Sequence, residues 1–176
     1  MTSSRKVSTT AVDGALARSL LAEFPPALRE ALLQDAVRVD FPAGTTAYHE
    51  ADEPRCYLVI TGLIRVYMIA PDGRQITVRY ARTGELLGIA AIVGGPAPVS
   101  VQILTDAALL MLNVKMLQRG GQNQPRVGWL MAQEVALRLF ETNGNWIQNG
   151  PRFSKGWERG KSSPPWPRIS QDSRRF

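Results

Sequence analysis

The chain has only one cysteine and one histidine among its 176 residues. One cysteine excludes a disulfide framework within the chain, and the two residues together cannot supply a four-ligand zinc site or an iron–sulfur cluster. No apolar run approaches the roughly 18 residues of a transmembrane helix, and the N-terminus lacks the compact apolar segment of a secretory signal. We therefore expect a cytoplasmic protein with no membrane span, no resident metal and no cofactor.

The positive charge of the chain is concentrated at one end. Residues 144–176 hold 7 basic and 2 acidic side chains, whereas residues 1–143 hold 14 and 13 and are close to neutral. Such a neutral body does not favour a nucleic-acid-binding surface. The 144–176 segment also has frequent Gly and Pro and no helical period, so we predict an irregular tail. Two hypotheses remain for it: a shifted reading frame from near Asn143, or a basic-aromatic arm that binds single strands.

Hydrophobic periodicity divides the rest of the chain into helices, a β-region and one longer helix. Helical spacing predicts helices over 14–33, broken at Pro25-Pro26, a short helix over 89–93 and a longer one over 125–143. Alternation and short apolar runs predict strands at 37–41, 56–60, 63–69, 75–80, 99–104 and 107–112. Closely spaced strands with turns between them favour a closed or double-sheet β-structure over a parallel α/β sheet.

Four motifs in the β-region carry a family resemblance. They are the Phe-Pro-Ala-Gly strand exit at 41–44, the Tyr-Leu-Val-Ile strand closed by Thr61-Gly62, the Asp-Gly-Arg hairpin at 72–74 and Gly-Glu-Leu-Leu-Gly at 84–88. In this order and spacing, residues 20–143 resemble the cyclic-nucleotide-binding-type sensory domain of Crp/Fnr transcription regulators. The resemblance implies a fold that is mainly β with flanking helices, a double-stranded β-helix (jelly-roll) barrel followed by a long dimerisation helix. It also implies a C-terminal helix-turn-helix that binds DNA.

The resemblance divides the chain into four parts. They are a disordered N-terminus (1–13), the jelly-roll sensory domain (14–120), the dimerisation helix (121–143) and the irregular basic tail (144–176). The tail contains no pair of amphipathic segments joined by a short turn, so no helix-turn-helix is recognisable in it. We therefore expect a regulator that is truncated before its DNA-binding domain.

The position of the effector pocket also follows from the resemblance. In cyclic-nucleotide-binding members a short helix N-terminus and an Arg hold the phosphate, and a Glu binds the ribose. Here Gly88 matches the glycine of that segment, but the Glu and Arg positions fall on Ile89 and Val99. No Arg, Lys or Glu occurs between residues 86 and 112, and we expect neither Arg79 nor Arg82 to reach the site. Losing a charge-assisted contact costs about 1.5–3 kcal/mol, which disfavours cyclic AMP and leaves a more apolar effector or an empty pocket. The candidate pocket residues are Gly88, Ile89, Ala90, Val99 and Ser100.

The longer helix carries a broad apolar stripe. The stripe contains Val127, Leu130, Met131, Val135 and Leu139. Its spacing is equally compatible with packing onto the barrel of the same chain and with a seam between two subunits. The family resemblance favours the seam, and therefore a homodimer.

Other reactive side chains occur singly in the sequence. We expect His49 to be a solvated or capping residue and Cys56 to be a small buried hydrophobe, with haem sensing through either as a minor alternative. Glu85 and Asp106 are isolated carboxylates, expected at turns or on the surface. Because no nucleophile, base or second carboxylate accompanies them, we expect no enzyme.

Three functions are compatible with these observations. We favour the effector-sensing and dimerisation portion of a Crp/Fnr-like transcription regulator, with the cyclic-AMP contacts not retained. DNA binding would then need a helix-turn-helix that is restored or supplied by a partner. A stand-alone dimerisation module that sequesters full-length relatives is one alternative. A cupin-like metalloprotein is the other, and the single histidine argues against it because such sites use two or three histidines.

Overall fold

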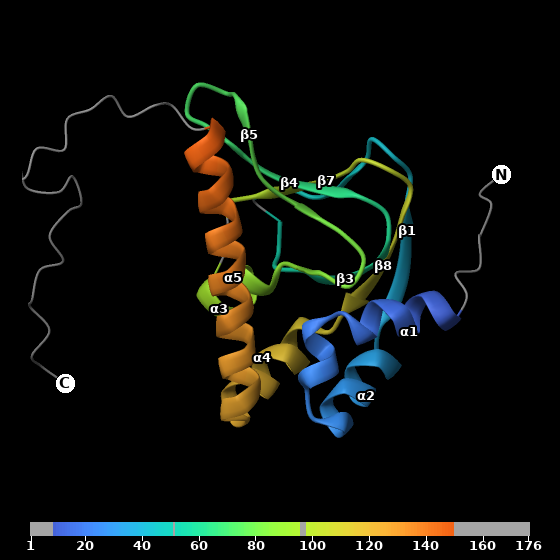
Figure 1. Cartoon of the computed structure of the whole chain (residues 1–176). Coiled ribbons are helices and arrows are strands. Elements are labelled where there is room, and N and C mark those ends of the chain that lie inside the picture. The colour runs from blue at the N-terminus through green and yellow to red at the C-terminus, as the bar shows by residue number, and fades with distance from the viewer. Residues whose placement is uncertain (1–8, 51, 96–97, 150–176) are drawn as a thin grey trace, which may run out of the picture.

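The computed structural model describes residues 9–50, 52–95 and 98–149. Over these residues the β-strands form two antiparallel sheets of four strands each (Figure 1). The strands are β1 (Val37–Phe41), β2 (Thr46–Tyr48), β3 (Cys56–Thr61), β4 (Ile64–Ile69), β5 (Gln75–Ala81), β6 (Leu86–Leu87), β7 (Ser100–Ile103) and β8 (Ala107–Leu112). The sheet orders, β1-β8-β3-β6 and β2-β7-β4-β5, are those of an eight-stranded jelly roll. The predicted fold class is confirmed.

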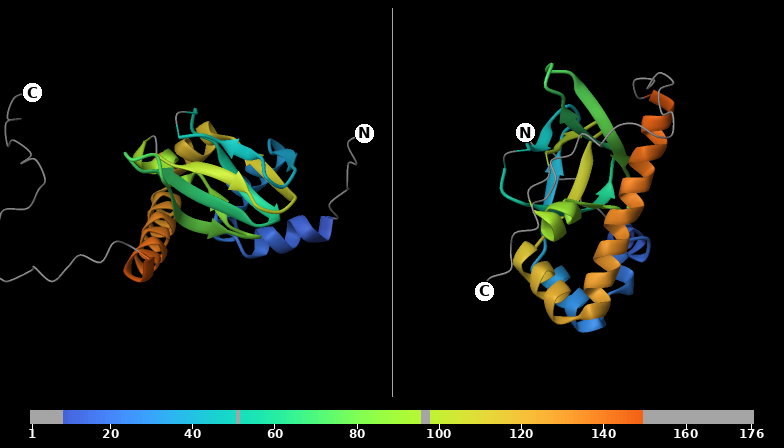
Figure 2. Two further views of the ribbon diagram at one scale, coloured as in Figure 1. Left: turned by 90° about the horizontal axis from the view of Figure 1, so that it is seen from above. Right: turned by 90° about the vertical axis from the view of Figure 1, so that its left-hand side faces the viewer.

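Helices flank the two sheets. The helices α1 (Thr9–Ala17), η1 (Leu20–Glu23) and α2 (Pro26–Gln34) precede β1, α3 (Ile89–Gly94) separates β6 from β7, and α4 (Val114–Asn123) and α5 (Pro125–Asn149) follow β8. The helix α5 contacts α3, α4, η1 and β5. Seen from the side and from above, α5 runs along one edge of the sheets (Figures 1 and 2).

The β4–β5 hairpin forms where the sequence predicts it. Ile69 pairs with Gln75 at the end of the ladder, and Gly73 takes a positive φ of 82° in the turn. The side chain of Asp72 accepts a hydrogen bond from the backbone N–H of Arg74 at 3.1 Å, which fixes the turn locally. This hairpin pairs the second half of β5 with β4, and there Arg79 and Ala81 are buried whereas Tyr80 between them is exposed.

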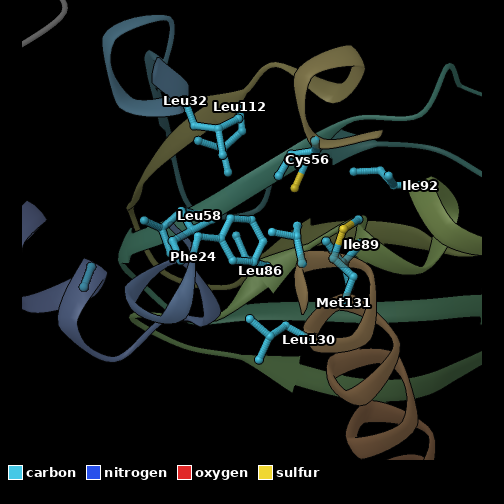
Figure 3. Close-up of a cluster of buried hydrophobic side chains, with 14 of the residues drawn as sticks. Phe24, Leu32, Cys56, Leu58, Leu86, Ile89, Ile92, Leu112, Leu130 and Met131 are labelled. Carbon is cyan, nitrogen blue, oxygen red and sulfur yellow. The ribbon is translucent and has the colours of Figure 1, made fainter. Parts of the chain in front are cut away.

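The core consists of two hydrophobic clusters, and β3 contributes to both. On one side of β3, Cys56, Leu58 and Ile60 belong to a cluster that the first sheet shares with the helices. Figure 3 shows side chains of β3, β6, α2, α3 and α5 converging in this helix-side cluster. The alternate residues Tyr57 and Val59 belong to the inter-sheet cluster, between the two sheets. All five of these residues are buried, which explains why β3 is a continuous apolar run.

The helix α4 is absent from the predicted elements and crosses the predicted domain boundary at residues 120 and 121. Its N-cap, Asn113, accepts a hydrogen bond from the N–H of Met116 at 3.1 Å. The two consecutive glycines in α4 look like a break in the sequence, but they allow close helix packing. A Cβ atom at Gly120 would lie 2.8 Å from Cδ2 of Leu28 on α2, and one at Gly121 would lie 3.1 Å from Sδ of Met131 on α5.

Both predicted irregular ends differ from the structure at their inner borders. The N-terminal segment 1–13 was expected to be disordered, yet α1 already begins at Thr9, because Ala15 is fully buried in the helix-side cluster and Ala11 and Val12 pack against it. At the other end, α5 continues to Asn149 instead of ending near Asn143. The remainder of the predicted tail, residues 150–176, lies outside the described residues.

Candidate functional site

A cavity of about 230 Å³ lies between the sheets, α3 and α5. Five parts of the chain line it: residues 48–50 and 52–55, the β4 and β5 strands, the segment from Leu86 to Ala91, Val99 before β7, and α5. Its wall is mostly apolar and includes Val66, Val78 and Leu87. Residues 49–50 and 52–55 are exposed at its rim, and the carboxylates of Glu50, Asp52 and Glu53 make this rim acidic. An apolar cavity with a few polar groups is the usual form of a small-molecule site.

Gly88 sets the position of α3 at the cavity. It precedes α3 with a φ of 85°, in the left-handed region that favours glycine. A Cβ atom at this position would overlap the carbonyl oxygen of Arg55, the residue immediately before β3. The first turn of α3 can therefore approach β3 this closely only because residue 88 has no side chain.

The structure brings together four of the five predicted pocket residues. Gly88, Ile89, Ala90 and Val99 all line the cavity. Ser100 does not line it: the residue is 2% exposed, and its hydroxyl accepts a hydrogen bond from the backbone N–H of Glu50 at 3.3 Å. This hydrogen bond ties β7 to the acidic rim. Effector binding by the other four residues remains a prediction.

Arg79 reaches the cavity, so the expectation that it lies outside the site is wrong. Its side chain is only 10% exposed and lines the cavity wall. Nη1 donates to Oε2 of Glu85 at 2.7 Å, and Nη2 donates to the backbone carbonyl of Leu86 at 3.0 Å. Strand alternation gave the opposite signal, because the large apolar residues Ile76, Val78 and Tyr80 alternate with Arg79 and predict that it faces outward. The ladder shifts register at this point, where Val66 pairs with Arg79 and Tyr67 with Thr77. Arg82, by contrast, is exposed and does not line the cavity.

Glu85 is not an isolated surface carboxylate as the sequence suggested. In addition to Arg79, its Oε2 lies 3.5 Å from Nη1 of Arg138 on α5. Arg138 also pairs with Glu134 at 2.8 Å, one turn earlier in the helix. The four side chains form an ionic chain that we call the Arg79–Glu134 chain. It links β5 and the β5–β6 turn to α5 beside the cavity. Asp106, the other carboxylate, accepts from the backbone N–H of Ala43 at 2.9 Å and acts as a turn residue.

The apolar stripe of α5 packs largely onto its own chain. Val127, Leu130 and Met131 are buried in the helix-side cluster, and Val135 packs against that cluster and lines the cavity. Of the two alternatives for the stripe, packing within the chain therefore holds for these four residues, and their side chains are already covered. Leu139 is 59% exposed and also lines the cavity. The large apolar side chains that α5 leaves exposed among the described residues are Trp129, Leu137 and Leu139. Dimerisation through α5 remains a prediction.

Two weakly acidic side chains stay protonated near neutral pH: Tyr48, which lines the cavity, and Cys56, which belongs to the helix-side cluster. The ring of Tyr48 stacks on Tyr57 with centroids 6.3 Å apart, and burial raises its pKa to about 12. Cys56 is fully buried, and burial raises the pKa of its thiol to about 12 as well. The expectation of a small buried hydrophobe at position 56 is confirmed. Neither group is ionised near neutral pH, so neither is suited to act as a nucleophile or a base there.

His49 lies at the cavity rim, where its backbone N–H donates to Oδ2 of Asp52 at 2.9 Å. Within the part of the chain that the structure describes, no three His, Cys, Asp or Glu side chains are grouped so that they could hold a metal ion. The described helices also include none that is both long and apolar enough to cross a bilayer.

The raised pKa of Cys56 predicts a loss of stability at alkaline pH. The unfolded thiol ionises around 9.0, whereas the buried one stays neutral to about 12. This contribution to stability is complete below pH 9 and decreases as the pH rises, by about 1.4 kcal/mol at pH 10. Urea titrations of the wild type and of Cys56→Ala, between about pH 8 and pH 10, measure it. Other groups titrate equally in both proteins, so the difference between them isolates Cys56. Identical pH dependence in the two proteins would contradict the prediction.

Comparison with known proteins agrees with this geometry. Residues 38–123 match the model of the family described as "Cyclic nucleotide-binding domain". The CRP-like cAMP-activated global transcriptional regulator of Mycobacterium tuberculosis is 27% identical over 122 residues, which is 68% of this chain and 54% of that protein. The chain thus spans about half the length of the curated relatives of this kind that it matches.

Solved structures show the same fold. The N-terminal domain of a transcriptional regulator from Streptomyces coelicolor is 29% identical, with a TM-score of 0.55, and the match covers 74% of this chain and 95% of that one. The sensor domain of the transcriptional regulator DNR from Pseudomonas aeruginosa has a TM-score of 0.63 at 16% identity, with 77% and 93% of the two chains covered. The second likeness supports the fold alone.

Proposed function

Because residues 38–123 are a cyclic nucleotide-binding domain with Crp/Fnr-type transcription regulators as homologues at low identity, we propose that the chain is the effector-sensing and dimerisation portion of such a regulator. It would act in the cytoplasm, and its effector would be a small molecule more apolar than cyclic AMP. The relatives named above are regulators of transcription, and their names describe no enzymatic activity.

One observation carries the proposal about the effector. The cavity presents Ile89 and Val99 in its lining, and the family resemblance assigns to these two positions the glutamate and the arginine of the cyclic-nucleotide-binding members. The arginine that the fold does bring to the wall, Arg79, is already paired with Glu85 at 2.7 Å. A cyclic phosphate would find an apolar wall and a neutralised cation. An apolar ligand would instead gain about 25 cal/mol for each Å² of apolar surface that it buries there.

The cavity also offers a physical route from effector to helix. Val135, Arg138 and Leu139 belong to α5 and line the same cavity as the residues around α3. A ligand that contacts both walls must interact with α5 directly. It can shift the position or order of α5 by as much as its affinity differs between the alternative arrangements of the helix.

A neutral fluorescent naphthylamine, N-phenyl-1-naphthylamine, tests the proposal. We expect its fluorescence to rise on binding to the protein, because the cavity wall is apolar. About 1 mM cyclic AMP should neither displace the probe nor raise the melting temperature. A ligand with a Kd of about 10 μM would stabilise the protein by about 2.7 kcal/mol at that concentration, which is a shift of several degrees.

Two tryptophan variants control for binding elsewhere on the protein. Val99→Trp fills the cavity from a residue of its wall, and Val93→Trp adds the same side chain at a 51% exposed position outside it. The fluorescence increase should be lost in the first variant and kept in the second. Displacement of the probe by cyclic AMP, or equal fluorescence in both variants, would overturn the proposal.

A further inference from the structure

We infer that Glu85 determines the ligand specificity of the cavity, because its carboxylate forms an ion pair with the guanidinium of Arg79 and thereby excludes anionic ligands. The inference rests on the proposed function in one respect: the cavity has to be a ligand site. If it is, Glu85 is the residue that makes the cavity prefer uncharged effectors over anionic ones. In physical terms, Glu85 is a permanently bound competitor of any phosphate or carboxylate that enters the cavity.

The first step is the placement of Arg79. Its guanidinium lies in the cavity wall, among apolar residues that include Val66 and Val78. In this mostly apolar setting the guanidinium is the natural partner for an entering anion, because charge-assisted hydrogen bonds strengthen where water is excluded. The hydrogen bond from Nη2 to the carbonyl of Leu86 holds the group in this position independently of Glu85.

The second step is the placement of Glu85. It contacts Nη1 of Arg79 at 2.7 Å but does not itself line the cavity, so the carboxylate neutralises the guanidinium without taking up ligand space. An anion that bound Arg79 would have to share it with this carboxylate. Two negative groups on one cation, a few ångströms apart and partly shielded from water, repel each other.

The third step concerns the other cation at the cavity, Arg138. Arg138 is itself paired with Glu134 at 2.8 Å and lies 3.5 Å from Glu85. The Arg79–Glu134 chain therefore holds two cations and two anions, and the acidic rim adds further negative charge. None of these groups provides an excess of positive charge for a phosphate. Removing the negative charge of Glu85 leaves one cation in excess, and it removes the closest carboxylate, at 2.7 Å, from Arg79 in the cavity wall, whereas Arg138 keeps Glu134 at 2.8 Å.

The variant Glu85→Gln tests the inference. Glutamine keeps the size of the side chain and an oxygen that accepts from Nη1, but it removes the charge. We expect the variant to bind cyclic AMP about tenfold to a hundredfold more tightly than the wild type by isothermal titration calorimetry. Adenosine has the same base and a ribose without the phosphate, and its binding should not change. Glu85→Ala, measured in parallel, should show the same gain and decides the question if the glutamine variant does not fold.

Glu134→Gln is the matched control. It makes the same chemical change in the same ionic chain, but Glu134 contacts Arg138 and not Arg79. Arg138 also lines the cavity, but in this variant it keeps Glu85 at 3.5 Å and Arg79 keeps Glu85 at 2.7 Å, so the gain in affinity for cyclic AMP should be clearly smaller than in the Glu85 variants. The inference is overturned if Glu134→Gln gains as much as the Glu85 variants, if neither Glu85 variant gains, or if adenosine gains equally.

The experiment separates this inference from the proposed function. Tight binding of cyclic AMP to the wild type would refute the proposed preference for an apolar effector, yet a further gain in Glu85→Gln would still support the role of Glu85. Weak binding of cyclic AMP by the wild type, together with no gain in affinity in the Glu85 variants, would support the proposed preference for an apolar effector but refute the role of Glu85. In that case the apolar wall, and not Glu85, excludes the phosphate.

Discussion

Alanine at position 88 is expected to lower the free energy of unfolding by more than about 3 kcal/mol, a large part of the 5–15 kcal/mol typical of a domain. Two effects combine. An L-residue at a φ of 85° costs about 1–2 kcal/mol, and the new methyl group overlaps the carbonyl oxygen of Arg55. Because that oxygen belongs to the backbone at the start of β3, it cannot move without disturbing the central strand. Urea unfolding of Gly88→Ala, followed by circular dichroism, measures the loss.

Gly73→Ala provides the matched control for the backbone angle. Gly73 has nearly the same φ, 82°, but a Cβ atom there would meet nothing within 4 Å. This variant should lose only the cost of the left-handed conformation, about 1–2 kcal/mol. Equal losses at the two positions would show that the collision with Arg55 is relieved at little cost, and the close approach of α3 to β3 would then not depend on glycine.

The second large effect is expected at Leu130 on α5. Leu130 is 6% exposed in the helix-side cluster, so Leu130→Ala should cost about 2–5 kcal/mol. Leu137, two turns further on, is 59% exposed, and Leu137→Ala should change the stability of the monomer by less than about 0.5 kcal/mol. Comparing these two variants distinguishes the part of α5 that belongs to the core from the part that is exposed to solvent or covered by a second subunit.

Protein concentration makes the same pair informative about dimerisation. If a second copy covers the exposed side of α5, Leu137→Ala should weaken stability more at high concentration than at low concentration, because at low concentration both proteins are monomers and the lost contact between subunits no longer contributes. Leu130→Ala should cost the same at both concentrations. A small effect of Leu130→Ala under all conditions would contradict the packing of α5 into the core.

Local patterns predicted most of the β-structure. Alternation and the Asp72-Gly73 turn are local signals, and β4 and β5 follow them closely. The helix α4 was missed because Gly120-Gly121 has low intrinsic helix propensity, while its stabilisation comes from close contacts with α2 and α5 that no local window contains. The early start of α1 at Thr9 has the same cause. Its small apolar residues, among them Ala15, pack against the core, although the segment around Thr9 resembles a polar terminus.

The part of the cavity lining that is continuous in the sequence was predictable. Gly88, Ile89 and Ala90 follow one another, and the family resemblance placed them at the pocket together with Val99. The Arg79–Glu134 chain was not predictable in this way, because it joins residues of β5, the following turn and α5. The alternation of β5 points Arg79 outward, and the register shift in the β4–β5 ladder that accompanies its burial has no local signal. Its pairing with Glu85 depends on how the chain turns between β5 and β6, and the reach of Arg138 depends on where α5 packs.

The continuous burial of β3 has a consequence for the fidelity of folding. In most strands a slip of one residue would bring polar side chains into the core, and that cost enforces the correct pairing. A slipped β3 would merely exchange one apolar set for another, Cys56 and Leu58 for Tyr57 and Val59. The polarity of the side chains therefore cannot distinguish the two registers, so the register must be determined by the size of the side chains. The ring of Tyr57 fits between Tyr48 and Phe41 in the inter-sheet cluster, whereas the small thiol of Cys56 occupies the opposite face. Steric complementarity at these two neighbouring residues therefore selects the correct register of the central strand.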